Sequence, residues 1–351
     1  MVRRRAGNYE LWFAMEFEFS ADDLEGLTRV VVVGGPTGVG KTEFSLQLAE
    51  AVDGEIINVD SLQVYRHLDI GTDKVSEKAR RRVPHHLVDI LEPDEEFNAG
   101  QFKERATEAI EDITARGKRP LLVGGTGLYI RLLVHGLLDV PSPSDELREK
   151  YDRQAEEHGK DFLYRRLRQV DPDLAEEVHP NDLVRITRGL EVYDQTGKPL
   201  SVHQREHRFS TPNYHALKIV LARDREELYD RINRRVDQMI DEGLEEEYRR
   251  LVDEGWEPDL KPMKSIGYRQ MGEYIFGELS REEAIRDIKR QTRRYAKQQL
   301  SWFRNEPQTH WARAPLLEDG KVPEAVVRDV KMFFEGGEPV LEWADVDPYK
   351  V

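Results

Sequence analysis

Apolar residues along the chain fall into short β-branched runs separated by amphipathic stretches. Such runs are typical of buried strands, which we expect at 29–33, 55–59, 86–91, 121–123 and 218–222. Phe44, Leu48 and Val52 recur at helical spacing after the first run, and a second helical pattern begins at Asn98 and ends at Gly117. Strands that alternate with helices predict an α/β fold, in which helices cover both faces of a parallel sheet.

The pattern changes at Pro141-Ser142-Pro143-Ser144, after which only helical spacings recur until about residue 207. Helical patterns resume at Glu226 and run through Phe303. We therefore predict a P-loop-type core with C-terminal helices, interrupted by a helical insertion. The expected parts are an N-terminal extension at 1–28, the core at 29–141 and 216–311, the insertion at 142–215 and an acidic tail at 312–351 with an amphipathic piece at 326–334.

Composition narrows the classes of protein. A chain of 351 residues with 38% hydrophobic residues is long enough for about two domains, and no apolar run approaches the roughly 20 residues that span a bilayer. The absence of cysteine excludes disulfides and favours a cytoplasmic protein. Because the formal charge is −15, a nucleic-acid partner requires basic residues that are concentrated locally. An ordinary acidic surface or adaptation to high salt would also explain the excess of acid.

The first predicted strand leads into a glycine-rich turn that opens a helix, and this turn fits G-x-x-x-x-G-K-[ST]. Its residues are Gly35, Pro36, Thr37, Gly38, Val39, Gly40, Lys41 and Thr42. Backbone N–H groups and the positive end of the helix surround phosphate oxygens in such loops. Lys41 would reach the terminal phosphate, and the Thr42 hydroxyl can bind Mg²⁺. The motif predicts a diphosphate or triphosphate ligand without identifying the molecule that carries it.

Two acids follow predicted strands at the edge where ligands bind in open α/β sheets. Asp60 is expected near the phosphate loop, where it could hold Mg²⁺ through water or accept a proton. Capping a turn, assisted by Ser61, is an equally good interpretation. Asp89 resembles a Walker B acid, which binds Mg²⁺ in NTPases. The adjacent His85 and His86 are interpreted as structural, because neighbouring side chains on a strand point to opposite faces.

Several motifs together resemble the tRNA dimethylallyltransferases, also called tRNA isopentenyltransferases. Similar motifs are D-S-x-Q-V-Y-R at 60–66, D-I-G-T at 69–72, P-H-H-L-I-D at 84–89, G-G-T-G-L-Y at 124–129, R-A-L-E-V-Y at 188–193, T-G-K-P at 196–199, I-G-Y at 266–268 and Y-A-K-Q-Q-L-S-W-F at 295–303. The resemblance runs from about Arg29 to Asn305, and Gly38-Val39 replaces the more usual Ala-Ser of the phosphate loop.

This resemblance implies transfer of a dimethylallyl group from dimethylallyl diphosphate to N6 of the adenosine that is 3′-adjacent to the anticodon of a tRNA. The phosphate loop would then hold the diphosphate together with Mg²⁺. The residues implied in catalysis are Asp60 as the base, Thr126 beside the bridging oxygen and Arg223 on the leaving diphosphate. Without the resemblance, a threonine in a glycine-rich turn would be interpreted as structural.

The resemblance also implies contacts with the anticodon stem-loop, whose target base must leave its stack to reach the site. Residues 284–305 carry seven basic side chains and one acid, Asp287, opposite an apolar face. A solvated charged face is the usual alternative for such a run. The residues implied in tRNA binding are Asp60, Ser61, Leu62, Gln63, Val184, Arg185, Ile186, Thr187, Arg188, Lys264, Ser265, Ile266, Gly267, Tyr268, Arg269, Arg293 and Arg294. We expect a monomer.

Three other functions fit part of the pattern. A P-loop kinase that uses ATP on a small molecule accounts for the phosphate loop and Asp60, but leaves the helical insertion and the basic C-terminal helix unexplained. An enzyme that prenylates free adenine nucleotides has no need of the basic segments. An RNA-binding switch gated by a nucleoside triphosphate would couple nucleotide turnover to RNA affinity.

Overall fold

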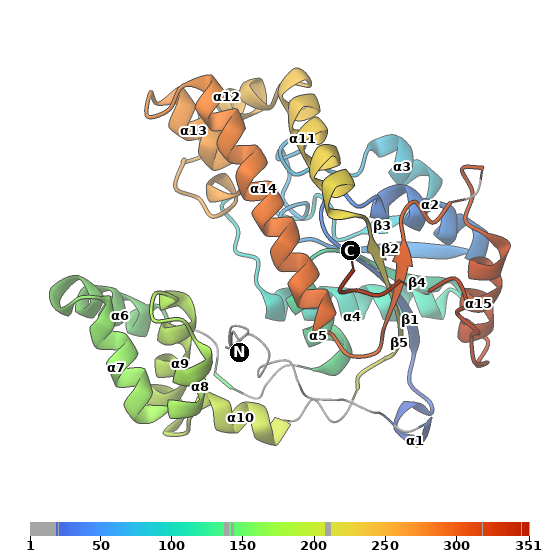
Figure 1. The fold of residues 1–351 in the computed structure, drawn as a ribbon, viewed down its shortest axis with the longest axis horizontal. Helices are drawn as coiled ribbons and strands as arrows, with labels where there is room; N and C mark the ends of the chain where they lie inside the picture. Colours follow the sequence, from blue (N-terminus) through green and yellow to red (C-terminus); the bar gives the residue numbers. More distant parts are fainter. Residues whose placement is uncertain are drawn as a thin grey trace, which may run out of the picture. The chain divides into compact units, whose positions relative to one another are not determined.

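The computed structural model describes residues 19, 21–136, 140–141, 144–207, 212–317, 319–344 and 346–350, which form two compact units (Figure 1). The larger unit, Leu24–Val134 with Asn213–Val351, contains the sheet. The described part of the smaller unit, within His135–Pro212, is built from helices. Most of the predicted N-terminal extension lies outside the described residues, apart from the short helix α1 (Ala21–Leu24).

All strands of the sheet are parallel, and their order is β3-β2-β4-β1-β5-β6. The strands are β1 (Arg29–Gly34), β2 (Gly54–Val59), β3 (His85–His86), β4 (Arg119–Gly124), β5 (His215–Ala222) and β6 (Thr309–Arg313). Val59 pairs with Gly124, and Gly34 pairs with Val220. The segments that follow β2, β4, β1 and β5 therefore meet at one edge of the sheet.

The predicted α/β fold is confirmed, but two details of the sheet differ from the prediction. The strand expected at 86–91 is wrong beyond His86. Leu87 and Asp89 have φ angles of 61° and 55°, a left-handed conformation that ends a strand, and Leu91 makes only an isolated bridge to Tyr65. Strand β6 was not predicted, because its sequence Thr-His-Trp-Ala-Arg lacks the β-branched run that identified the other strands.

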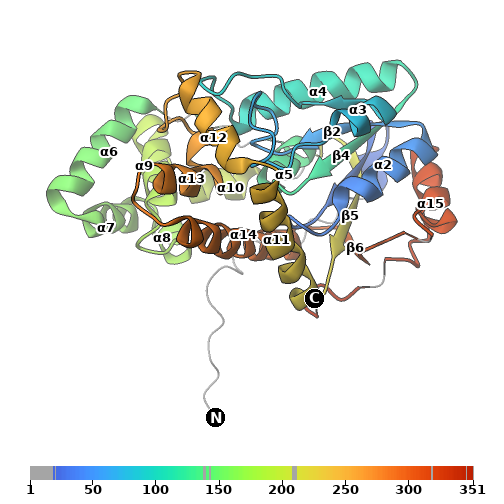
Figure 2. The same ribbon diagram turned by 90° about the horizontal axis from the view of Figure 1, so that it is seen from above.

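Helices of the larger unit pack on the sheet and on one another (Figure 2). Those in the first part of the chain are α2 (Lys41–Val52), α3 (Glu77–Arg82), α4 (Ala99–Ala115) and α5 (Gly127–His135). Helix α2 packs on β2 and β4. Helix α15 (Glu324–Phe334), which lies near the end of the sequence, packs on α2. The amphipathic piece predicted at 326–334 is therefore confirmed as a helix that covers part of the core.

The C-terminal helices are arranged around the longest one, α14. They are α11 (Arg225–Asp241), α12 (Leu244–Asp253), the 3-10 turn η1 (Pro262–Lys264), α13 (Tyr268–Ile275) and α14 (Arg281–Arg304). Both α11 and α13 pack against α14, and Ser280 with Glu283 forms a capping box at its start. Its far end is fixed by Glu306, which is buried and pairs with the equally buried Lys218 of β5 at 2.8 Å.

The smaller unit has a hydrophobic core of its own. Its helices are α6 (Asp145–His158), α7 (Lys160–Val170), α8 (Pro172–Glu177), α9 (Leu183–Thr196) and α10 (Leu200–His207). Tyr151, Leu167 and Leu190 lie at the centre of this core. The fully buried Asp171 accepts hydrogen bonds from the backbone N–H groups of Leu174 and Ser201, so it joins the start of α8 to α10.

The acidic tail is packed along the larger unit. The buried carboxylate of Asp329 accepts hydrogen bonds from the Leu341 N–H and the Trp343 indole, at 3.0 and 2.9 Å. The Val346 N–H donates to the carbonyl of Trp311 in β6, and Arg304 of α14 donates to the carbonyl of Pro348. The tail thus runs back over β6 and the end of α14. Among the described helices, none is both long and apolar enough to cross a membrane.

Candidate active site

The phosphate loop joins β1 to α2 and is closely packed against β5. Gly35 has a φ angle of 138°, and a Cβ atom at this position would lie 2.7 Å from the carbonyl oxygen of Leu221. Only glycine fits there, because both the backbone conformation and the space exclude a side chain. The turn directs the chain into the N-terminus of α2 at Lys41.

The Lys41 ammonium lies inside the loop. Its Nζ donates to the carbonyls of Gly35 and Pro36, both at 2.9 Å. Burial and, to a smaller extent, the positive charge of Arg235 lower the pKa of Lys41 to about 8, although the carboxylates of Asp60 and Asp73 partly oppose both effects. The surroundings of Lys41 favour its neutral form, and an anionic ligand would stabilise the charged form. The loop is therefore suited to bind an anion.

Three arginines surround the same loop. Arg223, directly after β5, donates to the carbonyl of Val39 at 2.8 Å, and Arg231 of α11 donates to the carbonyl of Gly38 at 2.9 Å. Arg235, one helical turn further, donates to the Thr37 hydroxyl at 2.6 Å and pairs with Asp73. Sequence reasoning identified Arg223 and missed the other two. Their i, i+4 spacing indicated a shared helix face, but not that this face meets the loop.

Asp60 follows β2 and uses one carboxylate oxygen in a turn. Its Oδ1 accepts hydrogen bonds from the backbone N–H groups of Leu62 and Gln63, at 2.8 and 3.3 Å. Within the described residues Oδ2 makes no hydrogen bond. The turn cap is therefore present, and the second oxygen is available to a substrate. The structural interpretation of Asp60 thus applies to Oδ1, and its role as a base stays a prediction for Oδ2.

Thr126 lies in the turn between β4 and α5, next to β2, the strand that Asp60 follows. Its backbone N–H donates to the carbonyl of Val59 at 3.4 Å. The hydroxyl of Tyr295 in α14 interacts with the side chains of Thr126 and Gln299. Burial of this hydroxyl, followed by the charge of Asp60, raises the pKa of Tyr295 to about 12, while 38% of the whole residue stays exposed. Tyr295 therefore lies beside Asp60 and Thr126 with part of its surface exposed.

Gln299 of α14 connects two of the site's loops. Its Oε1 accepts the Thr37 N–H at 2.8 Å, and its Nε2 donates to the Gly125 carbonyl at 3.0 Å. Sequence reasoning assigned no role to Gln299 or Tyr295, although both lie in the Y-A-K-Q-Q motif. With Asp60 after β2, Thr126 after β4, the loop after β1 and Arg223 after β5, the edge of the sheet combines an anion site with a free carboxylate oxygen.

Asp89 does not have the surroundings of a magnesium ligand. Its carboxylate pairs with Lys74 at 2.5 Å and with Arg80 at 2.7 Å. Although burial raises the pKa of Asp89, these two ion pairs hold it below the usual value. His86 bonds to Glu55, and the His85 ring bonds to the Val83 carbonyl. The resemblance of Asp89 to a Walker B acid is thus limited to its position, and the histidines make structural contacts.

The residues implied in tRNA binding differ in exposure. Gln63 donates to the carbonyls of Thr72 and Asp73, both at 3.2 Å. Tyr268 is fully buried and donates to Glu247 at 2.5 Å, while Lys264 and Arg269 are exposed. In the smaller unit, Val184 at the start of α9 is 81% exposed and Arg185 is also exposed. Ile186, by contrast, is in the core, and Arg188 pairs with Glu191.

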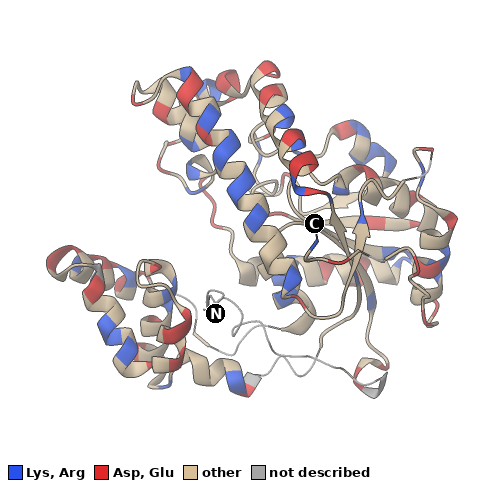
Figure 3. Cartoon of the chain, viewed as in Figure 1, with Lys and Arg blue, Asp and Glu red and all other residues tan. Residues whose placement is uncertain are grey.

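A basic stripe runs along α14, formed by Arg286, Arg290, Arg294 and Lys297 (Figure 3). These exposed residues are spaced by four, four and three positions, which places them on one helix face. Among the described residues, only Arg290 of the four has an ion pair, with Asp287. Arg293 lies off the stripe and donates to Asn233 at 2.5 Å.

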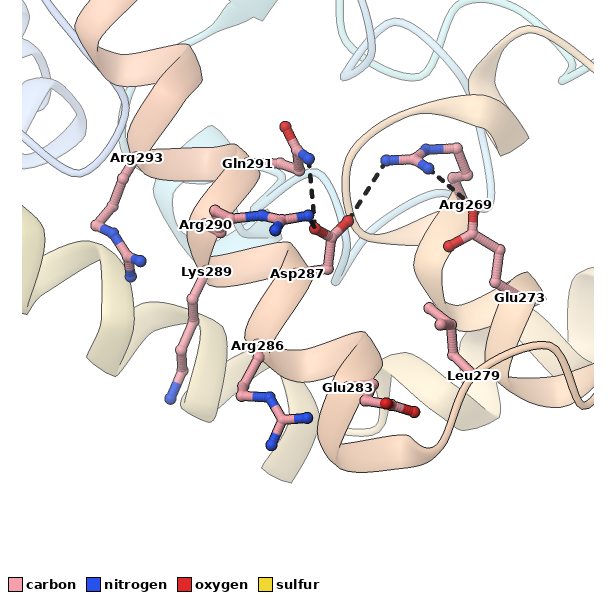
Figure 4. Close-up of a pocket in the computed structure, with 10 residues that line it drawn as sticks. All are labelled: Arg269, Glu273, Leu279, Glu283, Arg286, Asp287, Lys289, Arg290, Gln291 and Arg293. Atoms are coloured by element: carbon pink, nitrogen blue, oxygen red, sulfur yellow. Dashed lines mark hydrogen bonds and ion pairs between the residues drawn. The ribbon is translucent and has the colours of Figure 1, made fainter.

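The stripe borders an open groove of about 700 Å³ between α13 and α14 (Figure 4). Asp287 stands at its centre and faces Arg290, Gln291 and Arg269. Arg286 projects along the groove wall away from these contacts. Asp287 therefore pairs with two arginines, and the lining, with five basic and three acidic residues, keeps an excess of positive charge.

Comparison with known proteins places this geometry in a family. The chain is 50% identical to tRNA dimethylallyltransferase 1 of Citrifermentans bemidjiense over 293 residues, which is 84% of this chain and 94% of the relative. It is 51% identical over 291 residues to the tRNA dimethylallyltransferase of Geobacter metallireducens, covering 83% of this chain and 94% of the relative.

Solved structures agree with these relatives. A full-length tRNA isopentenylpyrophosphate transferase from Bacillus halodurans is similar over 88% of this chain and 96% of its own, with a TM-score of 0.63 and 38% identity. A eukaryotic dimethylallyltransferase acting on tRNA is similar over 90% of this chain and 82% of its own, with a TM-score of 0.75 and 30% identity.

The sequence pattern described as isopentenyl transferase matches residues 28–89, which contain the phosphate loop and Asp60. The pattern described as IPP transferase matches residues 63–306, from Gln63 to the end of α14, and the chain therefore belongs to the IPP transferase family.

Proposed function

We propose that this protein transfers the dimethylallyl group of dimethylallyl diphosphate to N6 of the adenosine 3′-adjacent to the anticodon in tRNA and releases diphosphate. The observation that carries the proposal is the edge of the sheet, where a cationic phosphate loop lies beside a carboxylate with one free oxygen. The names of the relatives, tRNA dimethylallyltransferases, support the same reaction. The absence of cysteine and a tRNA substrate favour a cytoplasmic enzyme, and we propose that it acts as a monomer.

The phosphate loop stabilises the leaving diphosphate. An exocyclic amine is a weak nucleophile, so breaking the C–O bond depends on dispersal of the charge that builds up on the bridging oxygen. Lys41, the loop N–H groups and Arg223 supply that positive charge, and Arg231 and Arg235 add to it from α11. Thr126, at the end of the adjacent strand, is assigned to the bridging oxygen through its hydroxyl.

Asp60 removes the proton of the amine. Its Oδ1 is held by the turn N–H groups, which fixes the orientation of the carboxylate, and Oδ2 accepts the proton as the new N–C bond forms. Fixing both the base and the diphosphate on one rigid sheet edge aligns the amine with the C–O bond. The partly exposed Tyr295 beside this edge offers a surface for the flipped adenine.

Magnesium fits the loop through a single protein ligand. Thr42 is exposed on the first turn of α2, and among the described residues no group of three carboxylates or histidines could form a closed metal site. This donor set suits Mg²⁺, which prefers to keep waters and to bind substrate phosphates rather than a protein cage. Mg²⁺ held by the Thr42 hydroxyl would neutralise charge on the diphosphate.

The anticodon arm is bound by positive surface on an acidic protein. The basic stripe of α14, Arg269 and Lys264 contact phosphates of the stem-loop, and Val184 and Arg185 provide contacts from the smaller unit. Residues 60–63 remain assigned to the target base and its neighbours. Ile186 and Tyr268 are both buried, so they support these contacts by packing beneath the surface residues. Concentrating cations in this way gives affinity for tRNA despite the net charge of −15.

The ATP-dependent alternatives explain less of the site. A P-loop kinase or an NTP-gated switch needs a carboxylate for the Mg²⁺ of its nucleotide, and Asp89, the acid with that position, is held by Lys74 and Arg80. Neither alternative uses the basic stripe together with a free Asp60 oxygen. We therefore favour prenyl transfer.

The first prediction concerns the reaction itself. Incubation with radiolabelled dimethylallyl diphosphate and unmodified tRNA should move the label onto tRNA, and digestion should recover it on adenosine N6. ATP should neither compete effectively nor be hydrolysed, because Asp89, the acid in the Walker B position, is engaged by Lys74 and Arg80. Hydrolysis of ATP that tRNA stimulates, with no label on tRNA, would support the switch instead.

The second prediction follows from the pKa of about 8 for Lys41. A buried amine with this pKa is charged below pH 8 and loses its proton above it, so the diphosphate loses its main cation as the pH rises. The dissociation constant of dimethylallyl diphosphate should stay level up to about pH 8 and then rise by up to about tenfold per pH unit. Calorimetric titration from pH 7 to 9.5 measures it. Lys41→Met should bind weakly without this rise, and equal wild-type affinity at both extremes would contradict the assignment.

The third prediction tests Asp60. In Asp60→Asn the amide oxygen can still accept the Leu62 and Gln63 N–H groups, so the turn should persist while the base is lost. Single-turnover transfer at saturating tRNA should slow by about 10²–10⁴-fold, with tRNA binding nearly unchanged. Asp53→Asn, on the exposed end of α2, is the matched control. A normal rate in Asp60→Asn would leave the carboxylate only as a turn cap.

The fourth prediction tests the basic stripe. Because Arg293 is engaged by Asn233, Arg294 and Lys297 are the more direct targets. Replacing both with Ala should weaken tRNA binding and reduce the slope of log affinity against log salt by roughly 0.7–0.9 per lost phosphate contact. Lys331→Ala on the exposed face of α15 removes one positive charge elsewhere and should leave the slope unchanged. A slope that is the same in all variants would mean that the stripe is merely solvated.

A further inference from the structure

The buried face of α14 is apolar except for one side chain beside the active site. Ala296, Leu300 and Phe303 pack into the core, and Gln299 lies between them, 7% exposed. A buried amide is costly unless its hydrogen bonds are made. Gln299 makes them with the backbones of two different loops, the Thr37 N–H of the phosphate loop at 2.8 Å and the Gly125 carbonyl of the β4–α5 turn at 3.0 Å.

The Gln299 amide is in close contact with the β4–α5 turn. A Cβ atom on Gly125 would lie 2.1 Å from the Gln299 Nε2, so the turn backbone lies directly against the amide. On the other loop, Thr37 is held at both its N–H, by Gln299, and its hydroxyl, by Arg235. The side chain of Gln299 therefore bridges the phosphate loop and the peptide that precedes Thr126, just beyond the point where β1 and β4 pair.

We propose that Gln299 is a positioning residue for prenyl transfer, whose amide fixes the phosphate loop relative to Thr126. This inference rests on the proposed function, in which the loop holds the diphosphate and Thr126 faces its bridging oxygen. Gln299 touches neither substrate in this account. It acts through Gly125 and Thr37, and its effect belongs to the alignment of the breaking C–O bond with the amine rather than to the affinity for either substrate.

This positioning role predicts different effects on kcat and on KM. The diphosphate is bound by Lys41, the arginines and the loop N–H groups, and of these Gln299 contacts only the Thr37 N–H. Loss of the amide should therefore leave binding nearly intact, while the two loops gain freedom to drift apart. A displacement of about 1 Å at a reacting centre can lower a rate by roughly 100-fold. We expect a fall in kcat with little change in KM.

The test compares Gln299→Met with Gln298→Met. Methionine keeps the length of the side chain and removes both hydrogen bonds, and Gln298 is the exposed neighbour on the same helix. For Q299M, kcat should fall by roughly 10- to 100-fold, and KM for dimethylallyl diphosphate and the tRNA dissociation constant should stay within about threefold of wild type. Q298M should resemble wild type in all three.

Gln299→Glu is measured alongside as a second variant. It keeps an oxygen for the Thr37 N–H but places another oxygen against the Gly125 carbonyl, so it should also lose kcat. A kcat for both variants within about twofold of Q298M, or a rise in KM with kcat unchanged, would overturn the positioning role. If one variant does not fold, the other decides. Transfer by wild type and Q298M tests the proposed function separately, because its failure would remove the activity of those proteins as well.

Discussion

The structure depends on a cluster of positive charges with which, among the described residues, only two carboxylates form ion pairs, Asp73 and Glu227. Lys41, Arg223, Arg231 and Arg235 converge on one glycine-rich loop, where backbone carbonyls and the Thr37 hydroxyl accept their N–H groups. The lowered pKa of Lys41 is the electrostatic consequence, because burial and a neighbouring guanidinium both disfavour its proton. A diphosphate would offset these positive charges, which are in place before an anion binds and would still be in place when the leaving group forms.

Parallel strands supply the rest of the site, and this is where prediction from sequence was strongest. Strands β1, β2, β4 and β5 were identified because strands buried on both faces read as continuous apolar runs. Their order was not needed to expect Asp60 near the loop, since the carboxyl ends of parallel strands share an edge. The error at 86–91 has a tertiary cause. Asp89 adopts its left-handed conformation where its carboxylate forms ion pairs with Lys74 and Arg80. No local sequence pattern indicates those partners.

Long-range contacts set the limit of what the sequence could reveal about the site. Gln299 bonds to Thr37 and Gly125 across 262 and 174 residues of chain, so nothing near it in the sequence points to its role. Arg231 and Arg235 had a visible periodicity but no visible partner. The family resemblance included the motif that contains Gln299, but it indicated no role for this residue. Asp60 shows the opposite case, because the turn cap expected from the sequence is present on Oδ1, and the role of a base stays a prediction for Oδ2.

Helix α14 combines the two tasks that a prenyltransferase for tRNA must join. One face carries the basic stripe, whose cations suit phosphates of a large polyanion, and the opposite face carries Gln299 and Phe303 into the core. The buried pair of Glu306 and Lys218 anchors the end of the helix to β5, the strand that leads to Arg223. A buried pair of this kind adds little net stability, but breaking it is costly, so it favours one register of the helix over others. The outer face of α14 and the Gln299 amide are thereby kept in a fixed relation to the sheet edge where the diphosphate would bind.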